Sequence, residues 1–201
     1  MRILVACEYS GTVRDAFLKK GHDAISCDIL PSSSPGPHIQ RDVTEILNDG
    51  WDMMIAFPPC TDLAVSGARH FPAKIADGRQ QRALDFVSAL LNAPIPKICL
   101  ENPVGVISTH IRKPDQIIQP WQFGHEAQKT TCLWLKNLPP LKATKIVGKG
   151  EFVTFRSGKR HPKWYSEIPS TGKPENALKR GKTFGGIAEA MAEQWSSSTH
   201  E

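Results

Sequence analysis

The chain has 201 residues, of which 40% are hydrophobic and 22% are charged, a composition typical of one globular domain. No apolar run approaches the roughly 20 residues of a membrane-spanning helix. The apolar stretch at residues 3–7 is too short for a signal peptide and is followed by Glu8. We therefore expect a cytoplasmic protein that makes no membrane contact.

The five cysteines are widely spaced, and no two of them form a Cys-x-x-Cys pair. They are Cys7, Cys27, Cys60, Cys99 and Cys132. This spacing indicates neither a disulfide framework nor a zinc site, and it suits a reducing compartment. The histidines are too scattered along the chain to suggest a metal centre, so we expect no metal.

Positive charge is concentrated in the second half of the chain. Residues 1–100 hold 10 basic and 11 acidic side chains, whereas residues 101–201 hold 15 and 9. Within that half, residues 142–182 hold 11 basic side chains and 3 acidic ones. Such a block favours a polyanionic partner such as nucleic acid, although a solvated lysine-rich surface would look the same on charge alone.

The start of the chain predicts a βαβ unit. Residues 2–7 form an apolar run typical of a buried strand, residues 12–20 have the pattern of a helix, and residues 22–28 predict a second strand. In nucleotide-binding sheets the first turn approaches the cofactor, and an acid about 20 residues further on binds ribose hydroxyls. Asp28 lies 17 residues after Gly11, so the spacing fits. The turn holds one glycine rather than three, so this signal alone is weak.

A later strand leads directly to a cysteine. The apolar run at residues 53–57 predicts a buried strand, and Pro58 and Pro59 end it because proline cannot donate a hydrogen bond to a neighbouring strand. Cys60 follows at once, at the edge of an open α/β sheet where ligands bind. A lone cysteine is more often a core residue, but this one is accompanied by the acidic sequence Glu-Asn-Pro at residues 101–103, after another strand.

The middle of the chain adds a helix and two strands. Residues 61–77 predict an irregular loop, whereas residues 79–91 have the periodicity of a helix with one apolar face. Short strands are expected at residues 97–100 and 131–135. No element can be assigned to residues 104–128.

The last part of the chain is basic and lacks apolar periodicity until a final helix. That helix is expected at residues 186–195, with Ile187, Met191 and Trp195 on one face. The whole pattern predicts a single α/β domain over residues 1–201, built on a doubly wound, mostly parallel sheet.

Several motifs occur in the order found in one enzyme family. They are VACEYSG at the first turn, FPPCT at Cys60, LENPVG at Glu101, KTTCLWL from Lys129, and the stretch from Arg180 to Trp195. On these motifs, which run nearly from end to end, the chain resembles a short member of the cytosine-5 DNA methyltransferase family. FPPCT and LENPVG in one chain are the specific part of the resemblance.

The resemblance implies a Rossmann-like fold that binds S-adenosylmethionine and acts on DNA. The residues that match the family's cofactor motifs are Cys7, Glu8, Ser10, Gly11, Asp28, Ile29, Asp42, Phe57, Pro58 and Ile187. Among them, Asp28 falls where the family binds the ribose, and Asp42 falls where a side chain meets the adenine. This cofactor needs no metal.

The family's catalytic motifs fall on Cys60, Glu101 and Asn102. Cytosine carbon 5 is a poor nucleophile, and a thiolate that adds to carbon 6 makes carbon 5 reactive towards a methyl group on a sulfonium. Cys60 is the expected nucleophile, and Arg69 is a candidate for a basic group that lowers its pKa. Glu101 is expected to balance charge at the ring nitrogen if a dry pocket raises its pKa. Asn102 is expected to brace the loop.

The chain departs from the family at three places. Lys129 is the nearest basic residue where the family's supporting motif has two arginines. Pro103 replaces the valine that follows Glu-Asn. The family's target-recognition region is reduced to a basic insert of 38 residues, 143–180. The resemblance therefore supports the chemistry better than it supports sequence-specific binding.

The basic insert combines cations with aromatic side chains. Lys129 outside it, and Lys159, Arg160 and Lys163 within it, are the expected nucleic-acid contacts. The aromatic residues of the insert suit base stacking, and they are Phe152, Phe155, Trp164 and Tyr165. We expect low sequence specificity and a preference for single-stranded or easily opened DNA, unless a homodimer or a separate specificity partner supplies recognition. The alternative is a solvated loop whose aromatic residues pack on the domain.

The sequence leaves other functions open. A methyltransferase acting on an exocyclic amine would need a hydrogen-bond acceptor where Phe57 stands, so that class is disfavoured. A decayed fold that binds nucleic acid or a protein without turnover would not need both Cys60 and Glu101. RNA or a free nucleotide could replace DNA as the substrate.

Overall fold

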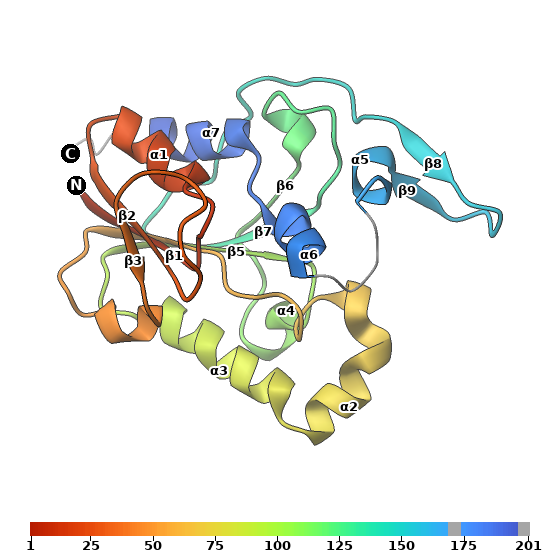
Figure 1. Ribbon diagram of the computed structural model, residues 1–201, viewed down its shortest axis with the longest axis horizontal. Coiled ribbons are helices and arrows are strands. Elements are labelled where there is room, and N and C mark those ends of the chain that lie inside the picture. The colour runs from red at the N-terminus through yellow and green to blue at the C-terminus, as the bar shows by residue number, and fades with distance from the viewer. Residues whose placement is uncertain (169–173, 197–201) are drawn as a thin grey trace.

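The computed structural model describes residues 1–168 and 174–196, and a seven-stranded sheet forms its centre (Figure 1). In the sheet the strands follow the order β3-β2-β1-β4-β5-β7-β6. Every neighbouring pair is parallel except the two that β7 makes with β5 and β6. The strands are β1 Arg2–Ala6, β2 Asp23–Asp28, β3 His38–Gln40, β4 Met53–Ala56, β5 Lys97–Pro103, β6 Gln116–Ile118 and β7 Thr131–Lys136.

The sheet changes its direction of growth between β1 and β4. β2 and β3 lie on one side of β1, and β4 and β5 lie on the other. In sheets of this kind the loops that follow the two central strands diverge at the carboxyl edge and leave a crevice for ligands. The fold class expected from the sequence, a doubly wound and mostly parallel sheet, is therefore confirmed.

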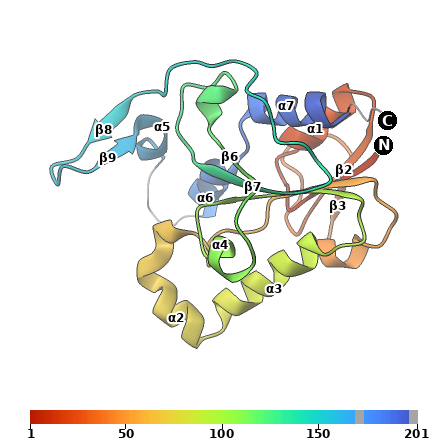
Figure 2. The same cartoon turned by 180° about the vertical axis from the view of Figure 1, so that it is seen from behind.

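Helices cover both faces of the sheet (Figures 1 and 2). Helices α1 Thr12–Lys19 and α7 Gly185–Ser196 pack against each other on one face. The opposite face is covered by α3 Arg79–Leu91, α4 Ile107–His110 and the 3-10 helix η1 Val43–Ile46. The result is a three-layer sandwich with a hydrophobic core on each side of the sheet.

The two cores follow from the alternation of side chains along β1. Ile3 and Val5 are fully buried in the layer that contains α1 and α7, whereas Leu4 and Ala6 are fully buried in the layer that contains α3. A central parallel strand is covered on both faces, so successive positions must all be apolar. This is why an unbroken apolar run predicted the strand correctly.

Most other predicted elements are present. The helix expected at residues 79–91 spans those residues as α3. The final helix begins at Gly185, and the apolar face expected on it is buried. Residues 104–128, to which no element was assigned, contain α4, β6 and the 3-10 helix η3 Pro120–Gln122.

The segment around Cys60 is more regular than the sequence predicted. The irregular loop expected at residues 61–77 is wrong, because the 3-10 helix η2 Val65–His70 and helix α2 Phe71–Ala76 lie there. Strand β5 also continues through Glu101 and Asn102, which were expected to follow the strand. The strand can extend because β7 pairs with it in antiparallel register along this stretch.

The basic insert is built from short elements that extend away from the sheet (Figure 1). An antiparallel hairpin of β8 Phe152–Thr154 and β9 Arg160–Pro162 leads into α5 Lys163–Ser166. Helix α6 Pro174–Gly181 then precedes α7.

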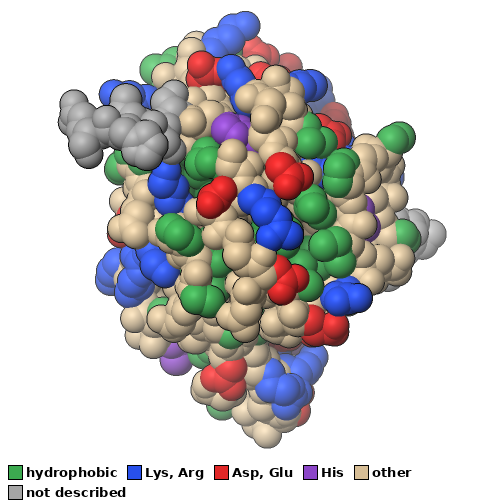
Figure 3. Space-filling view, turned by 90° about the vertical axis from the view of Figure 1, so that its left-hand side faces the viewer, with side chains coloured by type: hydrophobic (Ala, Val, Ile, Leu, Met, Phe, Trp, Pro, Cys, Tyr) green, Lys and Arg blue, Asp and Glu red, His purple; other side chains and the backbone are tan. Residues whose placement is uncertain are grey.

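The face of the molecule at the left of Figure 1 does not share the excess of basic residues found in the insert. Acidic and basic side chains are interspersed there with hydrophobic ones (Figure 3).

A fully buried arginine fixes the turn between β1 and α1. Arg14 has no exposed surface, and its guanidinium spans the gap to the loop between β2 and β3. It donates hydrogen bonds of 2.8–3.5 Å to Ser26 Oγ, Ser32 Oγ, Ser34 Oγ, Pro35 O and Pro37 O. Gly11 adopts φ +72°, and a Cβ there would overlap Arg14 and Ser34. No pattern in the sequence indicated this cluster.

We expect Arg14→Met to lower the free energy of unfolding by about 3 kcal/mol, because the substitution leaves buried hydroxyl and carbonyl groups without a donor. Urea denaturation measures the change. Arg41→Met is the control, since Arg41 is exposed and pairs with Glu45 at 3.6 Å. It should lower stability by less than about 1 kcal/mol. Equal losses for the two variants would contradict a structural role for the Arg14 cluster.

Candidate functional site

The candidate site lies where β4 and β5 end. The two strands are parallel neighbours in which Ala56 pairs with Leu100. Residues that follow these positions therefore emerge at the same edge of the sheet. Cys60 comes from the loop after β4 and is exposed, and Glu101 directly follows Leu100. The strand order thus brings the cysteine and the acid to one edge.

A side-chain hydrogen bond joins the loop after β4 to β5. Asn102 is 1% exposed, and its Nδ2 donates to the carbonyl oxygen of Pro58 at 2.9 Å. Pro58 and Pro59 have no N–H groups, so this loop cannot be held by donating its own backbone hydrogen bonds there. Asn102 thus makes the bracing contact that was expected of it. Its Oδ1 is buried and accepts no hydrogen bond from the residues that the structure describes.

Backbone contacts join the same two segments further along. Val65 N donates to Val104 O, and Val106 N donates to Leu63 O, both at 3.0 Å. A Cβ at Gly105 would overlap the carbonyl of Leu63. Glycine is therefore required for this close approach. The loops carrying Cys60 and following Glu101 form one connected unit.

The Cys60 thiol lies among charged groups of both signs. Although the residue is exposed, desolvation by the surrounding protein raises the pKa of its thiol, and the Glu101 carboxylate raises it further. The ammonium groups of Lys129 and Lys74 act in the opposite direction. The expectation that the site lowers this pKa is wrong, because desolvation outweighs the two cations.

Arg69 is not among the cations with the largest effect on the thiol. It lies on η2, is exposed, and donates from Nε to Nε2 of His70 at 2.9 Å. Lys129 and Lys74 take the electrostatic role that was expected of Arg69. A contact between Arg69 and a substrate stays a prediction.

Glu101 is partly exposed as a residue, but burial of its carboxyl group raises the pKa. The charge of Lys129 and a hydrogen bond with Thr131 lower it to a smaller extent. This agrees with the raised pKa expected of a proton donor in a dry pocket. A neutral Glu101 also removes one of the two main causes that raise the pKa of Cys60. Protonation of the acid and ionisation of the thiol therefore favour each other.

A small pocket that is open to solvent adjoins Glu101. Helix α7 begins at this pocket, and its start is held by a hydrogen bond of 2.8 Å from Gly186 N to Nε2 of His125. The pocket combines apolar walls with one acid, one cation and two hydroxyls. It is lined by Phe57, Glu101, Lys129, Thr131, Thr183, Phe184, Ile187 and Met191.

An aromatic cluster ties the basic insert to the pocket wall. Phe184 packs against His125 and Trp164, with ring centroids 5.2 and 5.5 Å away. Trp164 is fixed in turn, because its indole N–H donates to Gln128 O at 3.1 Å. From the sequence, Trp164 was expected to be available for base stacking. The structure instead shows it supporting Phe184.

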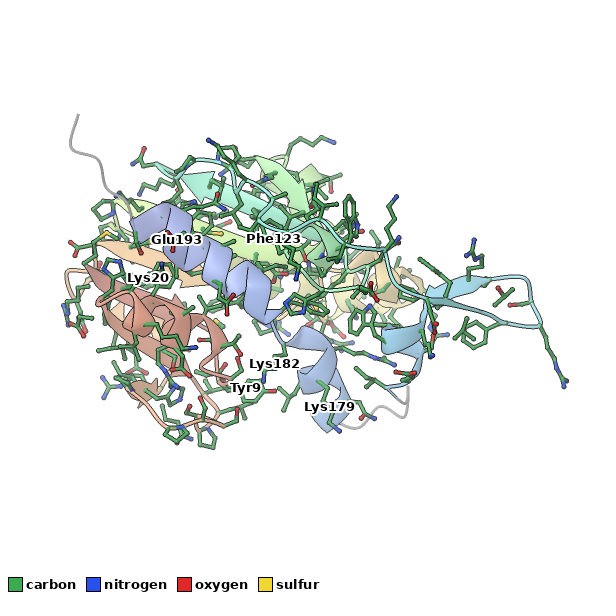
Figure 4. All side chains as sticks on the ribbon, turned by 90° about the horizontal axis from the view of Figure 1, so that it is seen from above. Tyr9, Lys20, Phe123, Lys179, Lys182 and Glu193 are labelled. Atoms are coloured by element: carbon green, nitrogen blue, oxygen red, sulfur yellow. The ribbon has the colours of Figure 1, made fainter. Side chains whose placement is uncertain are left out.

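Lys129 connects the pocket to α6. Its Nζ donates to Gly181 O at 3.3 Å and to Lys182 O at 3.4 Å. These carbonyls lie at the carboxyl end of α6, where a cation is favourable. Viewed from above, Lys179 and Lys182 lie on the same side of the molecule as Tyr9 of the first turn (Figure 4). The same ammonium group therefore braces α6 and acts on Cys60 and Glu101.

A second group of predicted residues gathers at the ends of β1, β2 and β3. Cys7 has the uncommon φ of +57°, and burial together with Asp28 and Asp42 raises the pKa of its thiol. Asp42 is exposed and accepts hydrogen bonds from Thr44, which lower its pKa. Ile29 is 72% exposed beside these carboxylates. An acidic edge with an uncovered apolar side chain results.

The predicted residues of the first turn make contacts inside the protein. Glu8 is 5% exposed, and its carboxylate accepts hydrogen bonds from Val13 N at 2.7 Å, Arg14 N at 3.2 Å and Ser10 Oγ at 3.1 Å. Burial raises the pKa of Glu8, and these hydrogen bonds lower it in part. The carboxylate caps α1 in place of an external anion. Cofactor contacts of Glu8, Ser10 and Gly11 stay predictions.

The cations predicted in the insert have different surroundings. Lys163 pairs with Glu151 at 2.6 Å, and the guanidinium of Arg160 lies 4.9 Å from the ring centre of Phe152. Lys159 is exposed near the end of the hairpin. Lys159 and Arg160 thus present positive charge to solvent, whereas the charge of Lys163 is partly neutralised.

Two residues that no sequence pattern indicated lie at the candidate site. Phe184 forms part of the pocket wall, and Lys74 acts on Cys60 while being 6% exposed. Among residues 1–168 and 174–196, no group of three His, Cys, Asp or Glu residues could hold a metal ion. No helix in these ranges is long and apolar enough to span a membrane.

We expect Glu101→Gln to lower the pKa of the Cys60 thiol, because a neutral amide removes a negative charge that disfavours the thiolate. At a fixed pH below the wild-type thiol pKa, alkylation of Cys60 by iodoacetamide should therefore be faster in the variant. Cys60→Ser reports the background from the other cysteines, and Glu45→Gln removes a remote exposed carboxylate as a control. An unchanged or slower rate in Glu101→Gln would contradict this electrostatic arrangement.

Comparisons with known proteins find resemblances among solved structures. No model of a known protein family matches the chain, and no curated protein matches it. Among solved structures, it is similar to a protein described as a candidate DNA modification methyltransferase encoded within a prophage (E. coli). The identity is 17% and the TM-score is 0.44, over 66% of this chain and 45% of that one. The chain therefore spans less than half of that structure.

Proposed function

We propose that the protein transfers a methyl group from S-adenosylmethionine to carbon 5 of cytosine in DNA, through a covalent bond between Cys60 and carbon 6. The observation that carries the proposal is the placement of Cys60 and Glu101 at one edge of the sheet, with Asn102 holding the Pro58 carbonyl. A nucleophile and a proton donor are both required at a pyrimidine ring, and the raised pKa of Glu101 suits the donor.

Cys60 and Glu101 take part in successive steps of the proposed reaction. The Cys60 thiolate forms a bond to carbon 6, and the electron pair of the 5,6 double bond shifts through carbons 5 and 4 to ring nitrogen 3, which takes a proton from Glu101. Carbon 5 then forms a bond to the methyl group, and the electron pair of the broken methyl–sulfur bond leaves with the neutral thioether. Nitrogen 3 returns its proton to Glu101, water accepts the proton from carbon 5, and the bond between carbon 6 and sulfur breaks to release the Cys60 thiolate and restore the aromatic ring. Lys129 lowers the pKa of both Cys60 and Glu101, so it favours the starting thiolate.

The residues at the neighbouring strand ends fit S-adenosylmethionine. The carboxylate of Asp28 suits ribose hydroxyls, the exposed Ile29 suits the face of an adenine ring, and Asp42 offers an acceptor to its amine. Phe57 and Ile187 line the open pocket on the way to Glu101. When bound, the cofactor supplies an electrophilic methyl group on a sulfonium.

Transfer to an exocyclic amine is a poorer fit. That reaction needs an acceptor for the amine protons next to the Pro-Pro turn, and the residue there is Phe57, which lines the pocket and has no acceptor. The same reaction gives no role to an exposed Cys60. Carbon 5 of the ring is therefore the better target.

The basic hairpin supports a nucleic-acid substrate. Phe155 is 47% exposed beside the cations Arg156 and Lys159. An uncovered aromatic ring among cations suits stacking on a base together with phosphate contact. The hairpin offers little surface for reading a duplex sequence. We infer low sequence specificity, unless a second copy of the chain or a separate protein supplies recognition.

The wild-type protein, incubated with S-adenosylmethionine and oligonucleotides, should produce 5-methylcytosine, measured by mass spectrometry of the released nucleosides. We expect Cys60→Ser to abolish the product, because the alcohol is far less nucleophilic than a thiolate, while cofactor binding in calorimetry stays within about twofold of wild type. Lys19→Ala, at an exposed lysine of α1 outside the site, is the control. Turnover of Cys60→Ser at the wild-type rate would contradict the covalent mechanism.

Binding of oligonucleotides across a salt series tests the role of the hairpin. We expect Lys159→Ala with Arg160→Ala to weaken binding and to reduce the slope of log affinity against log salt by about two, because two phosphate contacts are lost. Lys19→Ala with Lys113→Ala removes two exposed lysines outside the insert as the matched control. Single- and double-stranded DNA and RNA are compared. Equal salt slopes for both double variants would rule out the hairpin as the binding surface.

A further inference from the structure

Lys74 of α2 is a buried lysine next to the Cys60 loop. It is 6% exposed, and its Nζ donates a hydrogen bond to the carbonyl oxygen of Thr61. The carboxylate of Asp62 lies 3.3 Å from the same nitrogen, so the two form an ion pair. Removing a lysine from water is unfavourable unless its charge is compensated. Lys74 is therefore held in place by the residues that directly follow Cys60.

The turn that Lys74 contacts is also held by its own backbone and by two other side chains. Leu63 N and Ala64 N both donate to Cys60 O, at 3.0 and 2.9 Å, which closes the turn on itself. Gln80 at the start of α3 donates to Asp62 O at 3.3 Å. Asn102 holds Pro58 from the opposite side. Lys74 thus completes a set of side-chain contacts around the segment that carries the thiol.

The charged groups facing the thiol come from three elements. Glu101 of β5 disfavours the thiolate, whereas Lys129, before β7, and Lys74 of α2 favour it. Asp62 partly compensates the charge of Lys74. Of the two cations, Lys74 is the one that contacts the residues directly after Cys60. Its ammonium group is therefore held close to the thiol.

We propose that Lys74 is a positioning residue that fixes the turn from Cys60 to Ala64 and keeps a positive charge beside the Cys60 thiol. The inference rests on the proposed nucleophilic role of Cys60, but the geometry and the charge effect do not depend on methyl transfer. Helix α2 then serves the site through this lysine. Its contacts give a physical reason for a helix where the sequence predicted an irregular loop.

The rate of Cys60 alkylation by iodoacetamide, measured against pH, tests the proposal. Lys74→Met keeps most of the side-chain volume and removes the charge, so alkylation near pH 7.5 should slow by roughly three- to tenfold. Lys74→Arg keeps the charge and should restore most of the rate. Lys19→Met, at an exposed lysine of α1, should leave the rate unchanged. Alkylation of Lys74→Met at the wild-type rate would overturn the proposal.

A second variant separates the charge effect from simple loosening of the turn. Asp62→Asn removes the compensating negative charge but keeps Lys74, so alkylation should be faster than in wild type. A purely structural role would move the rate in the same direction in Asp62→Asn and Lys74→Met, and that result would also overturn the proposal. Because alkylation needs no methyl transfer, an inactive enzyme with these rate changes would refute the proposed function and leave the role of Lys74 standing.

Discussion

The hydrogen bond from the Asn102 amide to the Pro58 carbonyl joins the ends of β4 and β5, and the arrangement of the site depends on it. The two prolines remove the donors through which that loop could otherwise be fixed. Asn102 is 1% exposed, so loss of this hydrogen bond would leave a buried amide donor without its acceptor, at a cost of roughly 1–3 kcal/mol. The loop that carries Cys60 is therefore tied to the strand that carries Glu101.

The charges at this edge oppose one another. Glu101 raises the pKa of Cys60, and Lys129 and Lys74 lower it, so the thiol ionises more readily when the acid is neutral. Lys129 also holds the end of α6, and Trp164 supports Phe184 in the pocket wall. The basic insert is therefore joined to the pocket by packing as well as by charge, which gives the nucleic-acid binding that we propose for the hairpin a physical route to the pocket.

The sheet could be predicted from the sequence because buried parallel strands are continuous apolar runs. Glu101 could be placed because it directly follows such a run, and Cys60 because only two prolines separate it from another. Arg14 and Lys74 could not be predicted, since a long basic side chain on a short helix normally points to solvent. Their partners are distant serines and backbone carbonyls that carry no local signal. Trp164 was assigned to base stacking because sequence spacing does not show which aromatic rings pack against one another.

The central claim is that Cys60 forms a covalent bond to the cytosine ring while Glu101 donates a proton. The most direct measurement is intact-protein mass spectrometry after incubation with S-adenosylmethionine and an oligonucleotide that contains 5-fluorocytosine. Fluorine cannot leave carbon 5 as a cation, so the thiolate cannot be released after methyl transfer. The account predicts a stable protein–oligonucleotide adduct that peptide mapping assigns to Cys60. Absence of an adduct while cofactor and oligonucleotide both bind, or an adduct on another residue, would contradict it.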